Sequence, residues 1–355
     1  MTLMSNNHLE QPLAPLTRQQ TAATLGGPAI VLRGIAKSFG PKVAVANLDL
    51  MIPERSVYGF IGPNGAGKTT TIRMIMSIIF PDRGELSVLG KASAVESKDR
   101  IGYLPEERGI YRKMKVGAFL NYMGKLKGLD GGLALDQKVR SWLDRVNLGE
   151  TYKKKCEELS KGMQQKVQFI SAVIHEPDLI ILDEPFSGLD PVNRVLLREL
   201  IDEQRTKGRT IIFSTHAMFE AEQLCTHLFM IHKGKKVLDN TLEAVLKEHD
   251  PRTIQVEPLH ATDVQDSRWG GLPGVIEVHR KEKWLELKLD QTTTAEQVMP
   301  LAASMVPLRR IELARANLEQ IFIGHVGGSE AGLAAELEHF GIGSGGSNPG
   351  SGGDA

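Results

Sequence analysis

The sequence predicts an α/β fold with a mixed-sheet core, an inserted helical subdomain and a small α+β C-terminal domain. Short aliphatic runs at 57–61 and 178–183 have the composition of buried parallel strands. Helical periodicity then dominates from about 107 to 165, which predicts the insertion. After residue 250 the pattern returns to short strands, which predicts the additional domain.

A glycine-rich segment follows the first aliphatic run. GPNGAGKTT at 62–70 fits G-x-x-x-x-G-K-[ST], and the apolar residues of 70–80 suit a core-facing helix. Strand, turn and helix together predict the phosphate-binding loop of a P-loop NTPase, because backbone N–H groups and a helix N-terminus then face one anion. The expected nucleotide-binding residues are Gly62, Pro63, Asn64, Gly65, Ala66, Gly67, Lys68, Thr69 and Thr70. Lys68 would neutralise the β- and γ-phosphates, and the Thr69 hydroxyl would bind Mg²⁺. The simpler alternative is a glycine-rich turn with a surface lysine.

The second aliphatic run ends in two carboxylates. A buried strand at 178–183 would deliver Asp183 at its carboxyl end, where it could hold Mg²⁺. Glu184 follows and could deprotonate the water that attacks the γ-phosphate. An isolated pair of this kind would more simply be a solvated strand end, but the upstream phosphate loop favours the catalytic interpretation. The sequence therefore predicts an ATP hydrolase.

A third segment, LSKGMQQK at 159–166, lies between these two motifs. With it, residues 29–246 resemble the nucleotide-binding cassette of ATP-binding cassette (ABC) transporters. In that family this signature segment contacts the γ-phosphate held by the opposite subunit, which implies such a role for Ser160 and Gly162. The chain departs from the commonest form, LSGGQ, at Lys161 and Met163. From the residues alone, the segment could equally be a helix N-cap without a ligand.

The resemblance implies roles for four more residues. His216 corresponds to a switch histidine at the γ-phosphate, Phe39 to an aromatic ring stacked on adenine, and Asp190 to a loop that links the two sites of a dimer. From the residues alone, His216 could be a structural histidine and Phe39 a core residue. Glu106 replaces the usual glutamine that senses the γ-phosphate. A carboxylate there leaves open whether the metal contact persists with added charge or is lost.

The sequences of two segments resemble those of exporter-type members of the ABC family, including NatA-like sodium-export and multidrug-export subunits. These segments are YLPEERGIY at 103–111 and the signature segment. The resemblance implies an ATP- and Mg²⁺-dependent subunit that dimerises, with itself or a related ATPase, and powers export through a separate membrane permease. Two alternatives are a soluble ABC ATPase acting on ribosomes or nucleic acid and an importer subunit. The chain has a single cassette, which disfavours the soluble ATPase. An importer subunit would be favoured by glutamine at position 106, where this chain has Glu106.

The amino-acid composition indicates which classes of partner and which location this protein favours. Lys and Arg number 43, as do Asp and Glu, so no strong field favours nucleic acid. Cys156 and Cys225 show no CxxC spacing, which suits a reducing cytosol and gives no support for a zinc site. No run approaches the roughly 18 apolar residues that span a bilayer. We therefore expect a peripheral protein on the cytoplasmic face of the membrane.

Pattern changes divide the chain into four regions. Residues 1–28 are polar and lack the basic start and apolar core of a signal peptide, so they predict a flexible arm. Residues 29–250 form the expected ABC ATPase domain, and 251–326 an accessory domain of ferredoxin-like βαββαβ type that ends in a helix at 316–323. Residues 327–355 predict a flexible Gly/Ser-rich tail with a helical patch near 333–340.

Overall fold

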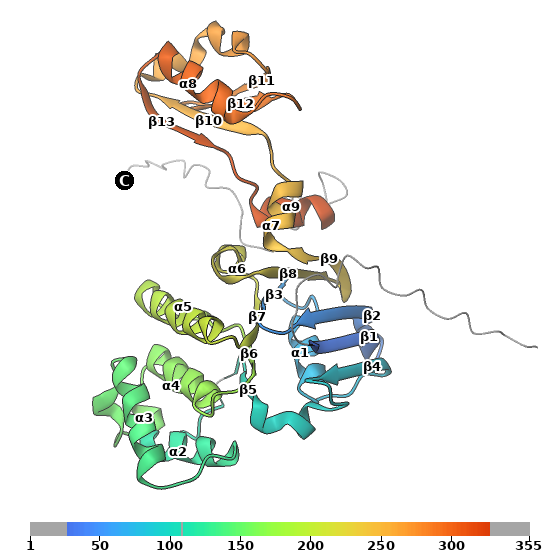
Figure 1. Ribbon diagram of the computed structural model, residues 1–355, viewed down its shortest axis with the longest axis vertical. Helices are drawn as coiled ribbons and strands as arrows, with labels where there is room; N and C mark the ends of the chain where they lie inside the picture. The colour runs from blue at the N-terminus through green and yellow to red at the C-terminus, as the bar shows by residue number, and fades with distance from the viewer. Residues whose placement is uncertain (1–26, 108, 327–355) are drawn as a thin grey trace, which may run out of the picture.

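A computed structural model describes residues 27–107 and 109–326. Most of the predicted N-terminal arm and all of the predicted tail, with its helical patch, lie outside these residues. Figure 1 shows the small C-terminal sheet at one end of an elongated molecule and the helices α2 and α3 at the other. Between them lies the larger sheet, whose strands carry the predicted motifs.

The central sheet is mixed, as the sequence predicted. Its six strands run in the order β5-β6-β7-β3-β8-β9, in which β9 alone is antiparallel to its neighbour. The strands are β5 (Ile101–Leu104), β6 (Leu179–Asp183), β7 (Thr210–Thr215), β3 (Val57–Ile61), β8 (His227–His232) and β9 (Lys235–Thr241). Because β3, β6 and β7 are adjacent and parallel, their carboxyl ends lie at one edge of the sheet.

A second, antiparallel sheet packs near the first helix. It contains β2 (Lys42–Pro53), β1 (Pro28–Phe39) and β4 (Arg83–Val88), and its core residues share a cluster with those of α1 (Lys68–Ile75). The sequence predicted that this helix would continue to residue 80, which is wrong. Ser77 adopts a left-handed backbone with φ of 55°, which ends the helix, and Ile78 and Phe80 are 54% and 72% exposed.

The predicted insertion is helical and shares its core with the central sheet. It consists of α2 (Val116–Leu126), α3 (Leu133–Arg145) and α4 (Lys161–Val173), with short 3₁₀ helices at Gly149–Thr151 and Cys156–Glu158. Helices α5 (Pro191–Thr206), α6 (Met218–Leu224) and α7 (Leu242–Glu248) follow, and a further 3₁₀ segment, Ala94–Arg100, precedes β5. Both cysteines are buried and unbonded to each other, in keeping with packing roles. None of the described helices has the length and apolar character needed to cross a membrane.

Two basic side chains hold the insertion on β5. Lys127, after α2, donates to the carbonyl oxygen of Ile101 at 2.8 Å, and the buried His175, after α4, has Nε2 at 3.2 Å from the same oxygen. Burial, with the nearby positive charge of Lys127, lowers the pKa of His175 to about 4. The charged imidazolium is therefore disfavoured in the folded protein.

Acid should consequently destabilise the fold through His175. Its folded pKa of about 4 lies below its ordinary 6.5, so the unfolded chain binds the proton more readily in that interval. Stability from this group is complete above about pH 6.5 and falls as the pH drops toward 4, by roughly 2–3 kcal/mol. We expect the His175→Gln protein to lack this acid-induced loss. The measurement is the free energy of unfolding in urea, compared between pH 7 and pH 4.5 for the wild type and the variant. An equal acid-induced loss in both proteins would contradict the prediction.

The C-terminal sheet is antiparallel throughout, with strand order β11-β12-β10-β13. It comprises β10 (Thr253–Pro258), β11 (Val275–Arg280), β12 (Leu285–Leu289) and β13 (Leu308–Leu313), with α8 (Ala295–Met305) between the last two. The first predicted helix of the βαββαβ pattern is instead two 3₁₀ helices, Ala261–Gln265 and Ser267–Gly271. Asp266, which accepts from the N–H of Arg268, and two glycines favour turns there over a continuous helix.

The last described helix leaves this sheet. Helix α9 (Leu318–Val326) buries Leu318, Ile321 and Phe322 in the same core cluster as residues of the central sheet. The N–H of Leu318 donates to Glu222 Oε1 on α6 at 2.9 Å, and Figure 1 shows α9 beside α7. The closing helix is therefore present, but it packs on the larger body. The predicted boundaries at 250 and 326 stay proposals.

Candidate active site

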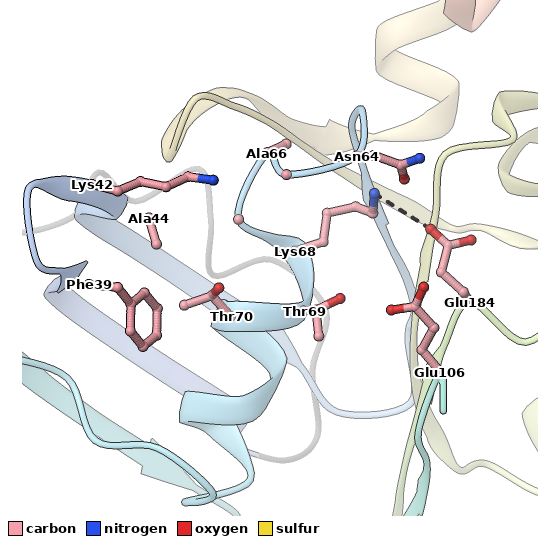
Figure 2. A pocket seen from close by; sticks show the side chains of 12 residues that line it. Phe39, Lys42, Ala44, Asn64, Ala66, Lys68, Thr69, Thr70, Glu106 and Glu184 are labelled. Atoms are coloured by element: carbon pink, nitrogen blue, oxygen red, sulfur yellow. Dashed lines mark ion pairs between the residues drawn. The ribbon is translucent and has the colours of Figure 1, made fainter. Parts of the chain in front are cut away.

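A pocket opens at the carboxyl edge of the central sheet, between the β1–β2 hairpin and the loop that precedes α1 (Figure 2). It gathers glycines, two ammonium groups, two carboxylates and one aromatic ring. The residues that line it are Phe39, Lys42, Ala44, Asn64, Gly65, Ala66, Gly67, Lys68, Thr69, Thr70, Glu106 and Glu184. Most of the predicted phosphate loop is thus brought together with Phe39 and Glu106.

The loop from β3 to α1 packs too closely for side chains at two positions. A Cβ at Gly62 would lie 2.2 Å from the carbonyl oxygen of Ile231, and one at Gly67 would lie 2.6 Å from that of Ala44. Lys68 follows and is 5% exposed, with Nζ donating to the carbonyl oxygen of Gly62 at 2.7 Å. Burial lowers its pKa, and Glu184 opposes that shift. The loop therefore curls around a fixed ammonium group.

Asp183 ends β6 as predicted and faces this loop. Thr69 Oγ1 donates to Asp183 Oδ1 at 3.2 Å, and Ser214 Oγ on β7 donates to the same oxygen at 2.5 Å. Burial raises the pKa of Asp183, although both hydroxyls favour its charged form. Its other oxygen, Oδ2, is buried and has no hydrogen-bond partner among the described residues. Such an oxygen, beside a hydroxyl, fits a hard cation such as Mg²⁺, which takes few protein ligands and completes its shell with phosphates.

Glu184 lies between the side chains of Lys68 and His216. Its Oε1 is 3.5 Å from Lys68 Nζ, and its Oε2 is 3.1 Å from His216 Nδ1. The contact with Glu184 raises the pKa of His216. Glu184 is a non-glycine residue with φ of 48°, held by its N–H donating to Ser214 Oγ at 2.9 Å. A left-handed backbone at such a residue is a strained conformation that is common at functional sites.

Glu106 follows β5 and lies beside Glu184, on the side of the pocket away from Phe39 (Figure 2). Burial raises its pKa, and the charges of Asp183 and Glu184 raise it further. The glutamate that replaces the usual glutamine therefore adds a third carboxylate near Lys68.

The chain is similar to known proteins in sequence and in fold. A family model described as ABC transporter matches residues 45–187, and one described as ATP-binding protein DrrA1-3-like, C-terminal domain, matches residues 241–326. An uncharacterized ABC transporter ATP-binding protein, YhaQ of Bacillus subtilis, is 40% identical over 82% of this chain and 97% of its own length. The chain belongs to the ABC transporter ATP-binding proteins. It is thus an ATP hydrolase and the ATP-binding subunit of a transporter.

Other ABC ATP-binding proteins agree with this placement. The Nod factor export ATP-binding protein I of Rhizobium sp. is 34% identical over 62% of this chain and 73% of its own length. A solved structure of an ATP-binding subunit of an ABC transporter is 28% identical, with a TM-score of 0.58, and covers 62% of this chain and 92% of its own.

The predicted signature segment, and Asp190, do not line this pocket. Ser160 caps α4 and accepts from the N–H of Met163 at 3.3 Å, and Asp190 caps α5 and accepts from the N–H of Asn193 at 3.0 Å. Gly162 lies next to Asn193, since a Cβ there would be 3.3 Å from its amide nitrogen. The predicted residues that neither line the pocket nor contact a lining residue's functional group are Ser160, Lys161, Gly162, Met163 and Asp190. Gly62, Pro63, Asp183 and His216 do not line it either, but each makes a hydrogen bond to Lys68, Thr69 or Glu184, which do.

Sequence reasoning missed three residues of the site. Lys42 and Ala44 line the pocket, and Ser214 holds both Asp183 and the backbone of Glu184. The pairing of Asp183 with Ser214 across β6 and β7 could have revealed the serine only if the strand order had been known. Lys42 had a local signal, because Gly40 and Pro41 before it are typical of a tight hairpin turn.

Proposed function

We propose that this protein hydrolyses ATP with Mg²⁺ to power export through a separate membrane permease, and that it works as a dimer on the cytoplasmic face of the membrane. One observation carries the proposal. Lys68, Asp183, Glu184 and His216 meet at one edge of the sheet, whereas the signature residues lie elsewhere on the same chain. A single chain therefore holds the two parts of an ABC site without joining them.

In the proposed reaction, each side chain has a role that follows from its position. Lys68 and the N–H groups of the loop would bind the β- and γ-phosphates, and Thr69 with Asp183 would hold Mg²⁺. The metal, when bound, supplies positive charge to the phosphate oxygens. Glu184 accepts a proton from the attacking water, and His216, hydrogen-bonded to its Oε2, orients the carboxylate.

The remaining binding groups belong to the base and to the partner copy. Phe39 is 51% exposed at the pocket wall, where its free face suits stacking with adenine. Ser160, Lys161, Gly162, Met163 and Asp190 would come from the second copy and close its side of the site. The dimer would close on ATP and reopen after hydrolysis. The Glu106 loop and the helical insertion would transmit this movement to the permease.

One finding supports export over import. The relatives include proteins named for Nod factor export. That name does not identify the cargo of this protein, because the cargo's path would lie in the permease.

The test is a detergent pull-down of Glu184→Gln protein with ATP, from membranes of the source cell. The variant should bind ATP, stall before hydrolysis and remain closed. We expect a multi-spanning membrane protein to co-purify with it, and not with Lys68→Ala protein, which lacks the phosphate-binding ammonium. Ribosomes or nucleic acid in place of a membrane protein would contradict the proposal. A permease recovered with an extracytoplasmic substrate-binding protein would contradict export.

A further inference from the structure

We infer that Lys42 is a further nucleotide-binding residue, whose ammonium binds the α-phosphate of ATP; the inference rests on the nucleotide site proposed above. Lys42 pairs directly with Phe39 across the β1–β2 hairpin, on the two sides of the turn Gly40–Pro41. Residues paired in an antiparallel ladder point to the same face of the sheet. The lysine therefore shares a face with the ring proposed to stack on adenine, and Ala44, two residues on, shares it too.

The direction of the side chain selects the part of the nucleotide that it meets. Figure 2 shows Lys42 extending from the hairpin toward the phosphate loop near Ala66. A nucleotide with its base on Phe39 and its terminal phosphates at Lys68 must place its ribose and α-phosphate between the two. Of these two groups, the α-phosphate is the anion, so it is the partner that an ammonium group favours.

Lys42 is also available for a ligand. It is exposed and makes no hydrogen bond or ion pair with the residues that the structure describes. Lys37, on the same hairpin, is already committed, because its Nζ is 2.7 Å from Asp82 Oδ1 and lies 5.6 Å from the centre of the Phe39 ring. Among the described residues that line the pocket, Lys68 is the only other cation, and it faces Glu184. No other ammonium or guanidinium group in that lining is therefore positioned for the α-phosphate.

The α-phosphate is not altered by hydrolysis, so its contact should stabilise the bound nucleotide equally before and during the reaction. Losing that contact raises KM and leaves kcat unchanged. For an exposed ammonium, we expect Lys42→Ala to raise the KM for ATP and the Kd for ADP by about fivefold. Because the ammonium is open to solvent, the difference from the wild type should shrink at high ionic strength.

The experiment measures ATPase kinetics and the displacement of a fluorescent ADP analogue by ATP, ADP, AMP and adenosine. It compares the wild type with Lys42→Ala, Lys42→Arg and Lys91→Ala, an exposed lysine outside the pocket. We expect Lys42→Ala to weaken ATP, ADP and AMP by the same factor and to leave adenosine unchanged. Lys42→Arg should restore most of the affinity, and Lys91→Ala should match the wild type.

Other outcomes overturn the inference. Unchanged affinity for the three phosphorylated ligands would show that Lys42 does not bind the nucleotide. Equal weakening of adenosine would place the contact at the ribose or base instead. Lys68→Ala separates failure of this inference from failure of the site. If it retains wild-type ATP affinity, the proposed nucleotide site itself is wrong; if it loses affinity while Lys42→Ala does not, only the role of Lys42 fails.

Discussion

Replacing Glu184 with glutamine should reduce ATP hydrolysis by at least about 100-fold, because a positioned general base contributes a factor of roughly 10² to 10⁴. Glutamine preserves the shape of the side chain but cannot accept the proton of the attacking water. The contacts of Lys68 with the phosphate loop do not depend on this carboxylate, so ATP binding should persist. Phosphate release under saturating ATP measures the first effect, and equilibrium binding of ATP measures the second.

The matched control for this substitution is Glu199→Gln, which makes the same chemical change at an exposed position on α5. We expect it to hydrolyse ATP at the wild-type rate. Wild-type turnover in the Glu184→Gln protein would show that another group activates the water. Loss of both binding and hydrolysis would show instead that the main role of Glu184 is to hold Lys68, whose Nζ lies 3.5 Å from its carboxylate.

A second large effect should appear when two inactive variants are mixed. Lys68→Ala removes the phosphate-binding ammonium, and Ser160→Arg blocks the signature surface, so each should lose at least about 100-fold in hydrolysis as a homodimer. Lys68→Ala should also lose ATP binding. The Ser160→Arg protein should bind ATP normally, because Ser160 lies outside its own pocket.

A dimer with one copy of each variant contains one intact site, built from the loop of one chain and the signature of the other. Random pairing makes half of the dimers mixed, and each mixed dimer has one intact site where the wild type has two. The mixture should therefore recover about a quarter of the wild-type rate. The measurement is ATPase activity of equimolar mixtures after subunit exchange, with each variant alone as control. A mixture as inactive as its components would contradict a site shared between copies.

The local chemistry of the site could be predicted from sequence because each part of it lies in a short continuous segment. Val57–Ile61 forms β3, the loop at 62–70 lies where the pattern required, and Asp183 ends β6. Strand ends and glycine-rich turns follow from residues within a few positions of one another. Phe39 and Glu106 line the same pocket, which adds support to assignments first made from family resemblance. Their roles remain proposals.

Boundaries were harder to predict where several local interactions compete. The apolar residues of 70–80 have helical spacing, yet α1 ends at Ile75 because the backbone reverses at Ser77. The helix predicted between β10 and β11 is also absent, and two short 3₁₀ helices take its place. Trp269, in the second of them, is fully buried and donates to the carbonyl oxygen of Asp263 in the first, which stabilises this arrangement.

The sequence by itself determined the α/β core of this ABC protein, the glycine-rich loop between β3 and α1, and the two carboxylates, Asp183 and Glu184, at the end of β6. Tertiary structure alone decided three further matters: Ser214 holds Asp183, Lys42 enters the pocket beside Phe39, and α9 packs on α6 rather than on the C-terminal sheet. The physical reason is the range of the interactions. Turns and helix starts depend on neighbouring residues, whereas strand order, hairpin register and helix docking depend on contacts between distant segments, and local periodicity does not specify which distant surfaces meet.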